Sequence, residues 1–510
     1  MGKYKGLILV FIFSILCGCT DLNEIVYDRI NAEDFYKTDE QVLAGLTNVY
    51  NKLMQVENWW WPWQLNECTT DHGMTPTRAN GAWYDGGVFF DLQLHKWDAT
   101  HARIALEYSY LYRGIASANS FLDILERVTM ENKEVLITEV KALRAWEYLH
   151  LCDYFGNVPI VTLAKLDPNN LPTNSTRKEV FDFIEGELLN CIDLLPSLTT
   201  MSVSARKSYY PRIAKETAQA MLVSLYLNAE VYSGTPRWQD CINVANEIIA
   251  SGVYSLTPSI RDNFIPLNQD SPEIILAISQ DNVNRGGGSG DSNTGGNWIN
   301  QLNMRLPLKE KYGITFNGWG GPSVLIEHYN IYDDADYRKS LILNGDQYSP
   351  TGKFLMKVIP IANVNNAADN EGLVDVKYLP DPQAVISGGR GWNRNDMVLL
   401  RYAEVLMSKA EALYRLGSTS GATDLINEVR ARNFITPKPL VNMTIDDLLQ
   451  EWSREFLWEC RYRTDLVRFG RFITERTQWK TYDDDPTRNI FPIPITEIQT
   501  NPNLVQNPGY

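Results

Sequence analysis

The chain has 510 residues, a length that corresponds to roughly two to four domains or to one large layered domain. Apolar residues make up 44% and charged residues 21%, which is ordinary globular composition and excludes a wholly disordered, a collagen-like or a polytopic membrane protein. The formal net charge of −15 disfavours nucleic acid and anionic lipid as the main partner, because both would repel the protein.

The first residues have the pattern of an export signal. Lys3 and Lys5 precede an apolar stretch, 7–17, which is too short to span a bilayer and has the length of the apolar core of a signal peptide. We therefore expect residues 1–18 to be removed when the protein is exported.

A cysteine follows this signal directly. The segment Leu16-Cys17-Gly18-Cys19 resembles the lipobox of bacterial lipoproteins, in which small residues precede a cysteine that is acylated and becomes the new N-terminus. The hydrophilic residues 20–23 suit a tether. We predict lipidation at Cys19 and anchoring to a membrane through the acyl chains. A plain secretory signal that is cleaved nearby is the alternative.

The cysteines of the mature chain have no CxxC spacing, and their number is odd. This pattern predicts neither a disulfide framework nor a zinc site, although the compartment is oxidising. We expect these residues to be buried as small apolar side chains. They are Cys68, Cys152, Cys191, Cys241 and Cys460.

Apolar residues recur at helical spacing in two parts of the N-terminal half. Residues 102–155 predict a helical hairpin. A second hairpin is predicted from a helix at 213–232, a turn at 233–236 and a return helix at 238–250.

A third predicted hairpin repeats the sequence pattern of the second. The Ala-Glu pair at 229–230 is matched by one at 410–411, and each is followed by a second amphipathic helix. Gly234 and Gly417 stand just past the first helices, where glycine supplies a left-handed C-cap. Such interrupted pairs resemble tetratricopeptide helix pairs, so we expect a mainly α fold with a scaffold of tetratricopeptide-like hairpins.

Two segments between the helices differ in character. Residues 58–97 and 258–394 are rich in Gly, Asn, Asp, Pro and Trp, which predicts long irregular loops that can present ligand-binding side chains. Within the second, 285–296 predicts a mobile loop tip. The resulting division is an N-terminal region at 19–257, with a binding loop at 58–97, and a C-terminal region at 258–510, with helices at about 396–470.

Four motifs occur in order along the chain. Residues 144–159 end in Phe-Gly-Asn-Val-Pro, 400–406 read Leu-Arg-Tyr-Ala-Glu-Val-Leu, 451–470 contain Arg-Glu and Asp-Leu-Val-Arg, and 492–510 begin Pro-Ile-Pro-Ile and end Asn-Pro-Gly-Tyr. Together with the lipobox they resemble the SusD/RagB family, the surface glycan-binding lipoproteins of Gram-negative nutrient-uptake systems. The resemblance covers the whole chain.

The third motif departs from the family at two positions. Cys460 stands where the family usually has Gly, and Tyr462 where an Arg is common. Glu455 and Glu459 are four residues apart, as are Glu459 and Arg463. We expect these charges to brace one helix or to hold a neighbouring loop. A catalytic role for them is the alternative.

The most informative loop is 71–87. A sugar ring offers a flat face of C–H groups and a rim of hydroxyls, so its receptor needs an aromatic plate and fixed charged or amide groups. The loop also resembles the Pro-Thr-Arg-x-x-x-x-Trp-Tyr-Asp-Gly-Gly stretch of many SusD-like proteins, where the Trp and nearby polar residues contact glycan. The alternative is that its aromatics only pin a surface loop. The predicted glycan-binding residues are Arg78, Asn80, Trp83, Tyr84 and Asp85.

Further aromatic residues stand in the second loop segment. Trp319 lies between glycines, which leaves it little local packing, and the resemblance places binding aromatics in this region. We predict Trp298 and Trp319 as binding residues; Phe316 and Trp392 are weaker candidates, with loop packing as the alternative. Most of the tryptophans in 59–63 we expect in the core or at a partner interface.

Catalytic and metal-binding patterns are absent from the sequence. The five histidines form no HExxH motif, and there is no GxSxG or Walker loop. Residues 291–302 superficially resemble a calcium loop, but the fifth position lacks an acid or amide and the twelfth is Leu. We predict no metal, no cofactor and no catalysis, although 62 acidic residues leave a glycosidase-type carboxylate pair undecided.

The resemblance implies a lipoprotein on the outer face of the outer membrane, anchored through Cys19. It implies that the protein binds oligosaccharide or polysaccharide without cutting it and delivers it to a SusC-like TonB-dependent transporter. No nucleic-acid partner is expected. A surface glycoside hydrolase and a helical-repeat adaptor that binds no sugar are the alternatives.

Overall fold

The computed structural model describes residues 36–510 except 54–56, 281–298, 388–389 and 481–484. The chain divides into two compact units, residues 1–44 and 45–510, and the aromatic loop and the histidine cluster described below both lie in the second. The predicted signal peptide, the lipidation site Cys19 and the binding residue Trp298 lie outside the described residues.

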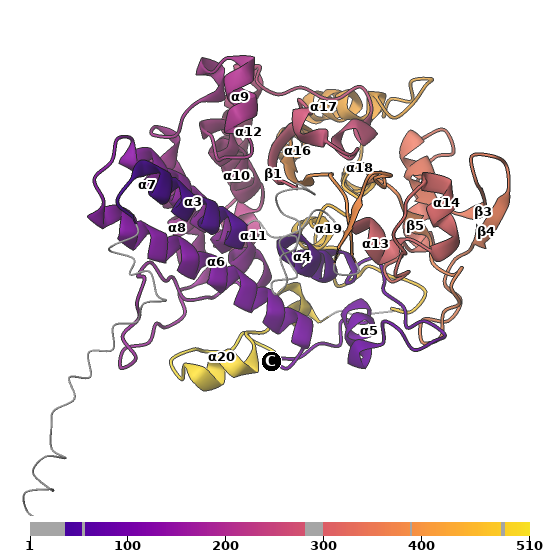
Figure 1. Ribbon diagram of the computed structural model, residues 1–510, viewed down its shortest axis with the longest axis horizontal. Helices are drawn as coiled ribbons and strands as arrows, with labels where there is room; N and C mark the ends of the chain where they lie inside the picture. Colours follow the sequence, from indigo (N-terminus) through magenta and orange to yellow (C-terminus); the bar gives the residue numbers. More distant parts are fainter. Residues whose placement is uncertain (1–35, 54–56, 281–298, 388–389, 481–484) are drawn as a thin grey trace, which may run out of the picture. The chain divides into compact units, whose positions relative to one another are not determined.

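The N-terminal half is helical, as predicted. Helices α6 and α7 form the first predicted hairpin, and α7 packs in turn on α8 (Figure 1). Helix α6 buries Ile104, Tyr108, Leu111 and Ile115, which recur every three or four residues and so lie on one face. The helices of this half are α3 (Asp39–Leu53), α4 (Glu57–Glu67), α5 (Val88–Gln93), α6 (Ala102–Arg127), α7 (Lys133–Tyr154), α8 (Arg177–Ile192), α9 (Val203–Tyr209), α10 (Lys215–Leu227), α11 (Ala229–Ser233) and α12 (Trp238–Ser251).

The second and third predicted hairpins are also present. The second consists of α10, α11 and α12; its predicted first helix is interrupted at Asn228, whose side chain accepts a hydrogen bond from Arg468 Nη1 at 2.9 Å. The third consists of α16 and α17. Gly234 and Gly417 adopt φ of 76° and 88°, which confirms the left-handed C-caps.

The described part of the C-terminal half combines helices with four antiparallel sheets of two strands each. Strand β1 pairs with β8, β2 with β5, β3 with β4, and β6 with β7. Its helices are α13 (Ile299–Asn303), α14 (Lys309–Tyr312), α15 (Ile326–Asn330), α16 (Tyr402–Arg415), α17 (Thr419–Ala431), α18 (Ile445–Glu455), α19 (Tyr462–Arg468) and α20 (Ile495–Thr500). Its strands are β1 (Ile274–Ile278), β2 (Ile342–Leu343), β3 (Gly345–Tyr348), β4 (Phe354–Val358), β5 (Val374–Asp375), β6 (Val385–Ser387), β7 (Arg390–Trp392) and β8 (Met397–Arg401).

The two predicted loop segments are more regular than expected. Helix α4 occupies the start of 58–97, although Pro62 stands inside it, because its side chains Trp63 and Leu65 are fully buried and tertiary packing outweighs local propensity. Strands β1 to β7 lie within 258–394.

Elements from both predicted regions pack together. Helices α10 and α12 contact α16, so the predicted boundary at residue 257 lies inside one compact unit. Strand β1 is buried throughout and pairs with β8 so that Ile274 lies opposite Arg401. This pairing places Arg401 in the interior.

The predicted helix at 451–470 is two helices. Helix α18 ends at Glu455 and α19 begins at Tyr462, and between them Trp458 and Cys460 both adopt a φ of 58°. The left-handed conformation at Cys460 accounts for the glycine that the resemblance places there. Because the helix is broken, the predicted pairing of Glu459 with Arg463 is wrong.

These charges instead join distant elements in a buried ionic network. Arg401 Nη1 lies 2.8 Å from both Glu273 Oε1 and Glu455 Oε1, and its Nε lies 2.7 Å from Glu459 Oε2. Burial alone would raise the pKa of Glu455, but Arg432, Arg401 and Arg338 lower it well below its usual range. The network therefore ties the β1–β8 sheet to α18, and these glutamates are structural.

The described cysteines form no disulfide within the described part of the chain, and the four cysteines outside the α18–α19 turn are buried, as predicted. No helix in the described ranges has both the length and the apolarity needed to cross a membrane.

Candidate functional site

The aromatic loop, residues 71–87, is held against two segments from the other half of the chain. Met74 and Ser323 exchange main-chain hydrogen bonds of 2.9 and 2.8 Å. Further along, the Ala79 amide donates to the Ala367 carbonyl and the Ala367 amide to the Thr77 carbonyl, both at 2.9 Å. These bridges fix the loop's backbone, so its side chains have defined positions.

Arg78 is buried below the loop and does not belong to its exposed surface. Its side chain is only 4% exposed, and its guanidinium donates to the carbonyls of Ala368, Glu371 and Gly321 at 2.7 to 3.1 Å. Burial lowers its pKa to about 10. Because its side chain is buried and both terminal nitrogens donate to carbonyls inside the protein, we leave Arg78 out of the proposed contact surface and assign it a structural role.

Trp83 lies at the junction of the two predicted loop segments. Its Nε1 donates to the carbonyl of Trp319 at 3.0 Å, and its indole rests on Gly321, where an added Cβ would come within 2.3 Å of Trp83 Cε2. Trp60 packs edge-on against the same indole, with ring centroids 6.4 Å apart. One edge of the ring is therefore buried, while the side chain as a whole is half-buried.

The neighbouring predicted residues lie at the surface. Tyr84 is 59% exposed, and Asn80 and Asp85 are exposed as well. Asp85 accepts from Arg103 Nη2 at 2.6 Å, and the Asn80 side chain accepts from the Ala82 amide at 3.0 Å. Each polar group is thus oriented by the protein and retains lone pairs that can meet a hydroxyl.

A hollow of about 280 Å³ opens beside these aromatics. Its lining includes Trp83, Tyr84, Thr77, Phe90 and Asn365, and among its lining residues in the described chain Asp91 is the single carboxylate. Flat apolar side chains with a few convergent polar groups suit the binding of a small polyhydroxylated ligand.

The other predicted aromatics divide into exposed and buried ones. Trp319 is 39% exposed and stands next to Trp83. Phe316 and Trp392 are 2% and 3% exposed, so the loop-packing alternative holds for both. In the run 59–63, Trp60 and Trp63 belong to the core.

Sequence reasoning missed several residues of this site. Phe90 and Asn365 line the hollow, and Arg305 lies behind it, where its Nη2 donates to Ser323 Oγ at 2.8 Å. Phe90 comes shortly after the loop in the sequence, so its proximity to Trp83 could have been predicted. Nothing in the sequence around Asn365 indicates that this segment pairs with the loop.

Comparison with protein families gives two matches. Residues 272–510 match the model described as the SusD family, and residues 31–227 match the model described as starch-binding, associating with outer membrane. Between them these two models span most of the chain.

Individual proteins agree with these models. The chain is 27% identical to the starch-binding protein SusD of Bacteroides thetaiotaomicron over 84% of its own length and 82% of the relative. It is 23% identical to the SusD-like protein P38 of Formosa agariphila over the full length of both. A solved laminarin-binding SusD-like protein has a TM-score of 0.76 at 24% identity, covering 93% of this chain and all of that one. The surface glycan-binding protein A of B. thetaiotaomicron, solved with laminarihexaose, has a TM-score of 0.74 at 20% identity, covering 92% and 100%.

Proposed function

This chain belongs to the SusD family, and from that membership we propose that it is a surface protein that captures oligosaccharides without cutting them. Three of the proteins named above are described as binding starch, laminarin or glycan, which supports binding over catalysis.

One observation carries the proposal to particular residues. Trp83 and the exposed Tyr84 line the hollow, and the indole of Trp83 donates to the main-chain carbonyl of Trp319, whose side chain is also exposed. We infer that these three aromatic side chains pack against the flat C–H faces of sugar rings. Asn80 and Asp85 are the proposed hydroxyl partners.

Isothermal titration of the purified protein against a panel of glycans tests the site. For a glycan that the wild type binds, we expect Trp83→Ala and Trp319→Ala each to weaken affinity by roughly thirtyfold, the size of a buried aromatic anchor. Phe354→Ala is the matched control, because Phe354 is 54% exposed but lies on β4, which Figure 1 draws apart from α5 and the aromatic loop. Unchanged binding by both tryptophan variants would show that the glycan binds elsewhere.

The same preparation separates the alternatives. A surface glycoside hydrolase would release shorter products from a bound oligosaccharide during prolonged incubation, which chromatography detects. A helical-repeat adaptor would give no heat of binding with any glycan. Intact ligand together with saturable binding supports the capture function.

We also propose how the protein is placed in the cell. The lipobox ending at Cys19 suits acylation, and the family model for the N-terminal region is described as associating with the outer membrane. We infer that lipid at Cys19 anchors the protein to that membrane. The partner that would take up the captured glycan is a SusC-like TonB-dependent transporter. Co-purification of such a transporter with the detergent-solubilised lipoprotein tests the assembly.

A further inference from the structure

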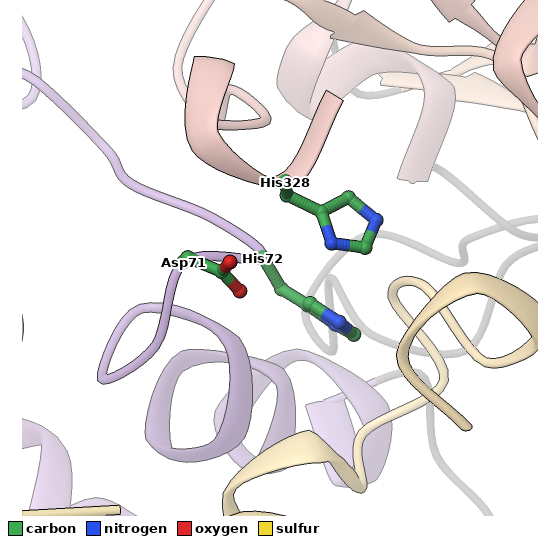
Figure 2. Close-up of side chains that lie close together, drawn as sticks. All are labelled: Asp71, His72 and His328. Carbon is green, nitrogen blue, oxygen red and sulfur yellow. The ribbon is translucent and has the colours of Figure 1, made fainter. Parts of the chain in front are cut away.

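Two histidines that are far apart in the sequence meet inside the protein. His72 follows α4, His328 lies in α15, and their rings contact edge to face with centroids 4.3 Å apart. Figure 2 shows Asp71 beside them, on the same segment as His72. One ligand atom from each of the three residues lies within 4.8 Å of the others.

The hydrogen bonds of His328 fix which of its nitrogens carries the proton. Its Nε2 lies 2.9 Å from the hydroxyl of Tyr332, and that hydroxyl donates its own proton to the Arg454 carbonyl at 3.1 Å. His328 Nε2 is therefore the donor to Tyr332. In the neutral ring, with the proton on Nε2, Nδ1 carries a lone pair.

His72 is oriented in the same way by a carboxylate. Its Nδ1 lies 2.7 Å from Glu67 Oε2, and the other oxygen of Glu67 accepts the Cys460 amide at 2.9 Å. With Glu67 ionised, His72 Nδ1 donates to it and Nε2 carries the lone pair. A carboxylate behind a histidine is the usual support of a metal-binding imidazole, because it fixes the ring and the tautomer.

Both lone pairs point at the same hydroxyl. Ser453 Oγ lies 2.9 Å from His72 Nε2 and 3.3 Å from His328 Nδ1. A serine has one proton and can donate to only one of them. The other fully buried nitrogen is left unsatisfied, unless Glu67 takes a proton and His72 shifts to the opposite tautomer. The arrangement thus needs one more positive charge, either a proton or a metal ion.

Asp71 offers a third ligand to such an ion. Its buried carboxyl shares a hydrogen bond with the carboxyl of Glu475, and the carboxyl of Glu327 lies near as well. A dication beside these carboxyls would offset both the burial and the repulsion.

We propose that Asp71 Oδ1, His72 Nε2 and His328 Nδ1 bind a zinc ion, with Ser453 Oγ placed for the fourth position. Two imidazoles and a carboxylate are ligands that zinc prefers, whereas calcium takes oxygen ligands. Ligand atoms on a tetrahedral zinc lie about 3.4 Å apart, so the set would contract by at most roughly 1.4 Å around the ion.

Such an ion would have a defined structural effect. His72 precedes Met74 and Trp83 in the aromatic loop, and His328 belongs to α15 in the other half of the chain. The metal would join these segments at the base of the loop. The inference does not depend on glycan binding, because its site and its test involve no sugar.

Because the ligand atoms are buried, the test lets the metal enter during folding. The full chain is unfolded with a chelator, refolded with and without one equivalent of Zn²⁺, gel-filtered and analysed by inductively coupled plasma mass spectrometry. We expect about one zinc per chain and a higher melting temperature in the zinc-refolded sample. Calcium in place of zinc is expected to be lost on gel filtration.

Variants locate the metal. His328→Gln and His72→Gln are expected to lose the zinc, while His150→Gln, whose ring bonds to the Trp146 carbonyl instead, is expected to retain it. If the first two variants fail to fold, cobalt-refolded wild type supplies the second readout, since four-coordinate Co²⁺ has intense visible absorption. Wild type that retains no zinc, or variants that retain it fully, would overturn the proposal in favour of a proton on Glu67.

Discussion

The indole Nε1 of Trp83 donates a 3.0 Å hydrogen bond to the main-chain carbonyl of Trp319, across 236 positions of sequence. This one contact brings the two predicted aromatic loops together and places the main chain of Trp319 beside the indole of Trp83. Its geometry depends on Gly321, on which the indole of Trp83 rests.

The close approach at Gly321 gives the first prediction. Gly321→Ala would place a methyl group 2.3 Å from Trp83 Cε2, which forces the indole to move. We expect at least roughly tenfold weaker glycan binding by calorimetry, because the aromatic plate is displaced. Gly186→Ala is the control, since a Cβ there meets nothing within 4 Å. Wild-type affinity in Gly321→Ala would mean that the position of Trp83 does not matter for binding.

The buried ionic network gives a prediction on stability. Arg401→Met removes the shared partner of Glu273, Glu455 and Glu459 and leaves their charges buried. We expect the free energy of unfolding to fall by about 3–5 kcal/mol, measured by urea denaturation. Arg127→Met, which breaks an exposed pair with Asp123, is expected to change it by about 0–1 kcal/mol. Equal losses in both variants would contradict the structural role of the network.

Two buried carboxyls predict that the stability of the folded protein depends on pH. Glu107 and Glu147 are 1% and 2% exposed and line a cavity of about 100 Å³. Burial raises the pKa of both, and for Glu147 the neighbouring Glu107 adds to the effect. As the pH rises, each carboxyl therefore ionises in the unfolded protein before it ionises in the folded protein. Above the pKa of the unfolded state, both groups lower the free energy of unfolding more and more as the pH increases.

Glu107→Gln removes this effect at one of the two positions. We expect the variant to gain melting temperature relative to wild type at pH 8 and to match it more closely at pH 4.5, where the folded carboxyl is protonated and about half of the unfolded carboxyl is as well. Glu126→Gln, an exposed position on the same helix, should show no such trend. A difference that stays constant with pH would argue against a buried neutral acid.

The proposed anchor is tested in cells. Cys19→Ala should abolish incorporation of radiolabelled palmitate and release the protein from the outer-membrane fraction, because the acyl chains supply the membrane affinity. Cys17→Ala, two residues earlier in the same segment, should keep both properties. Labelling of Cys19→Ala at the wild-type level would place the lipid elsewhere.

Periodic patterns predicted the scaffold well. The hairpin over 102–155 and the glycine caps at Gly234 and Gly417 follow from local spacing and backbone conformation, which the chain encodes residue by residue. Prediction failed at the break between α18 and α19. There the left-handed Trp458 and Cys460 are held by tertiary contacts, among them the hydrogen bond from Trp458 Nε1 to the His72 carbonyl.

The residues of the candidate site were likewise predicted only in part. Residue type indicated Trp83, Tyr84 and Trp319, because aromatic residues among glycines and asparagines have little local packing. The same reasoning predicted Arg78 as a glycan-binding residue and Phe316 as a weaker candidate, but both residues are buried. Exposure depends on which distant segment covers a side chain, and spacing along the chain carries no information about that.

The amino-acid sequence alone determined the helical hairpins and the family motifs, and it predicts the export signal, since each of these patterns depends on neighbouring residues. Tertiary structure decided which aromatics reach the surface, which arginines face glutamates, and that His72 meets His328. Those outcomes rest on the packing of segments hundreds of residues apart, where burial and charge pairing are set by the whole fold.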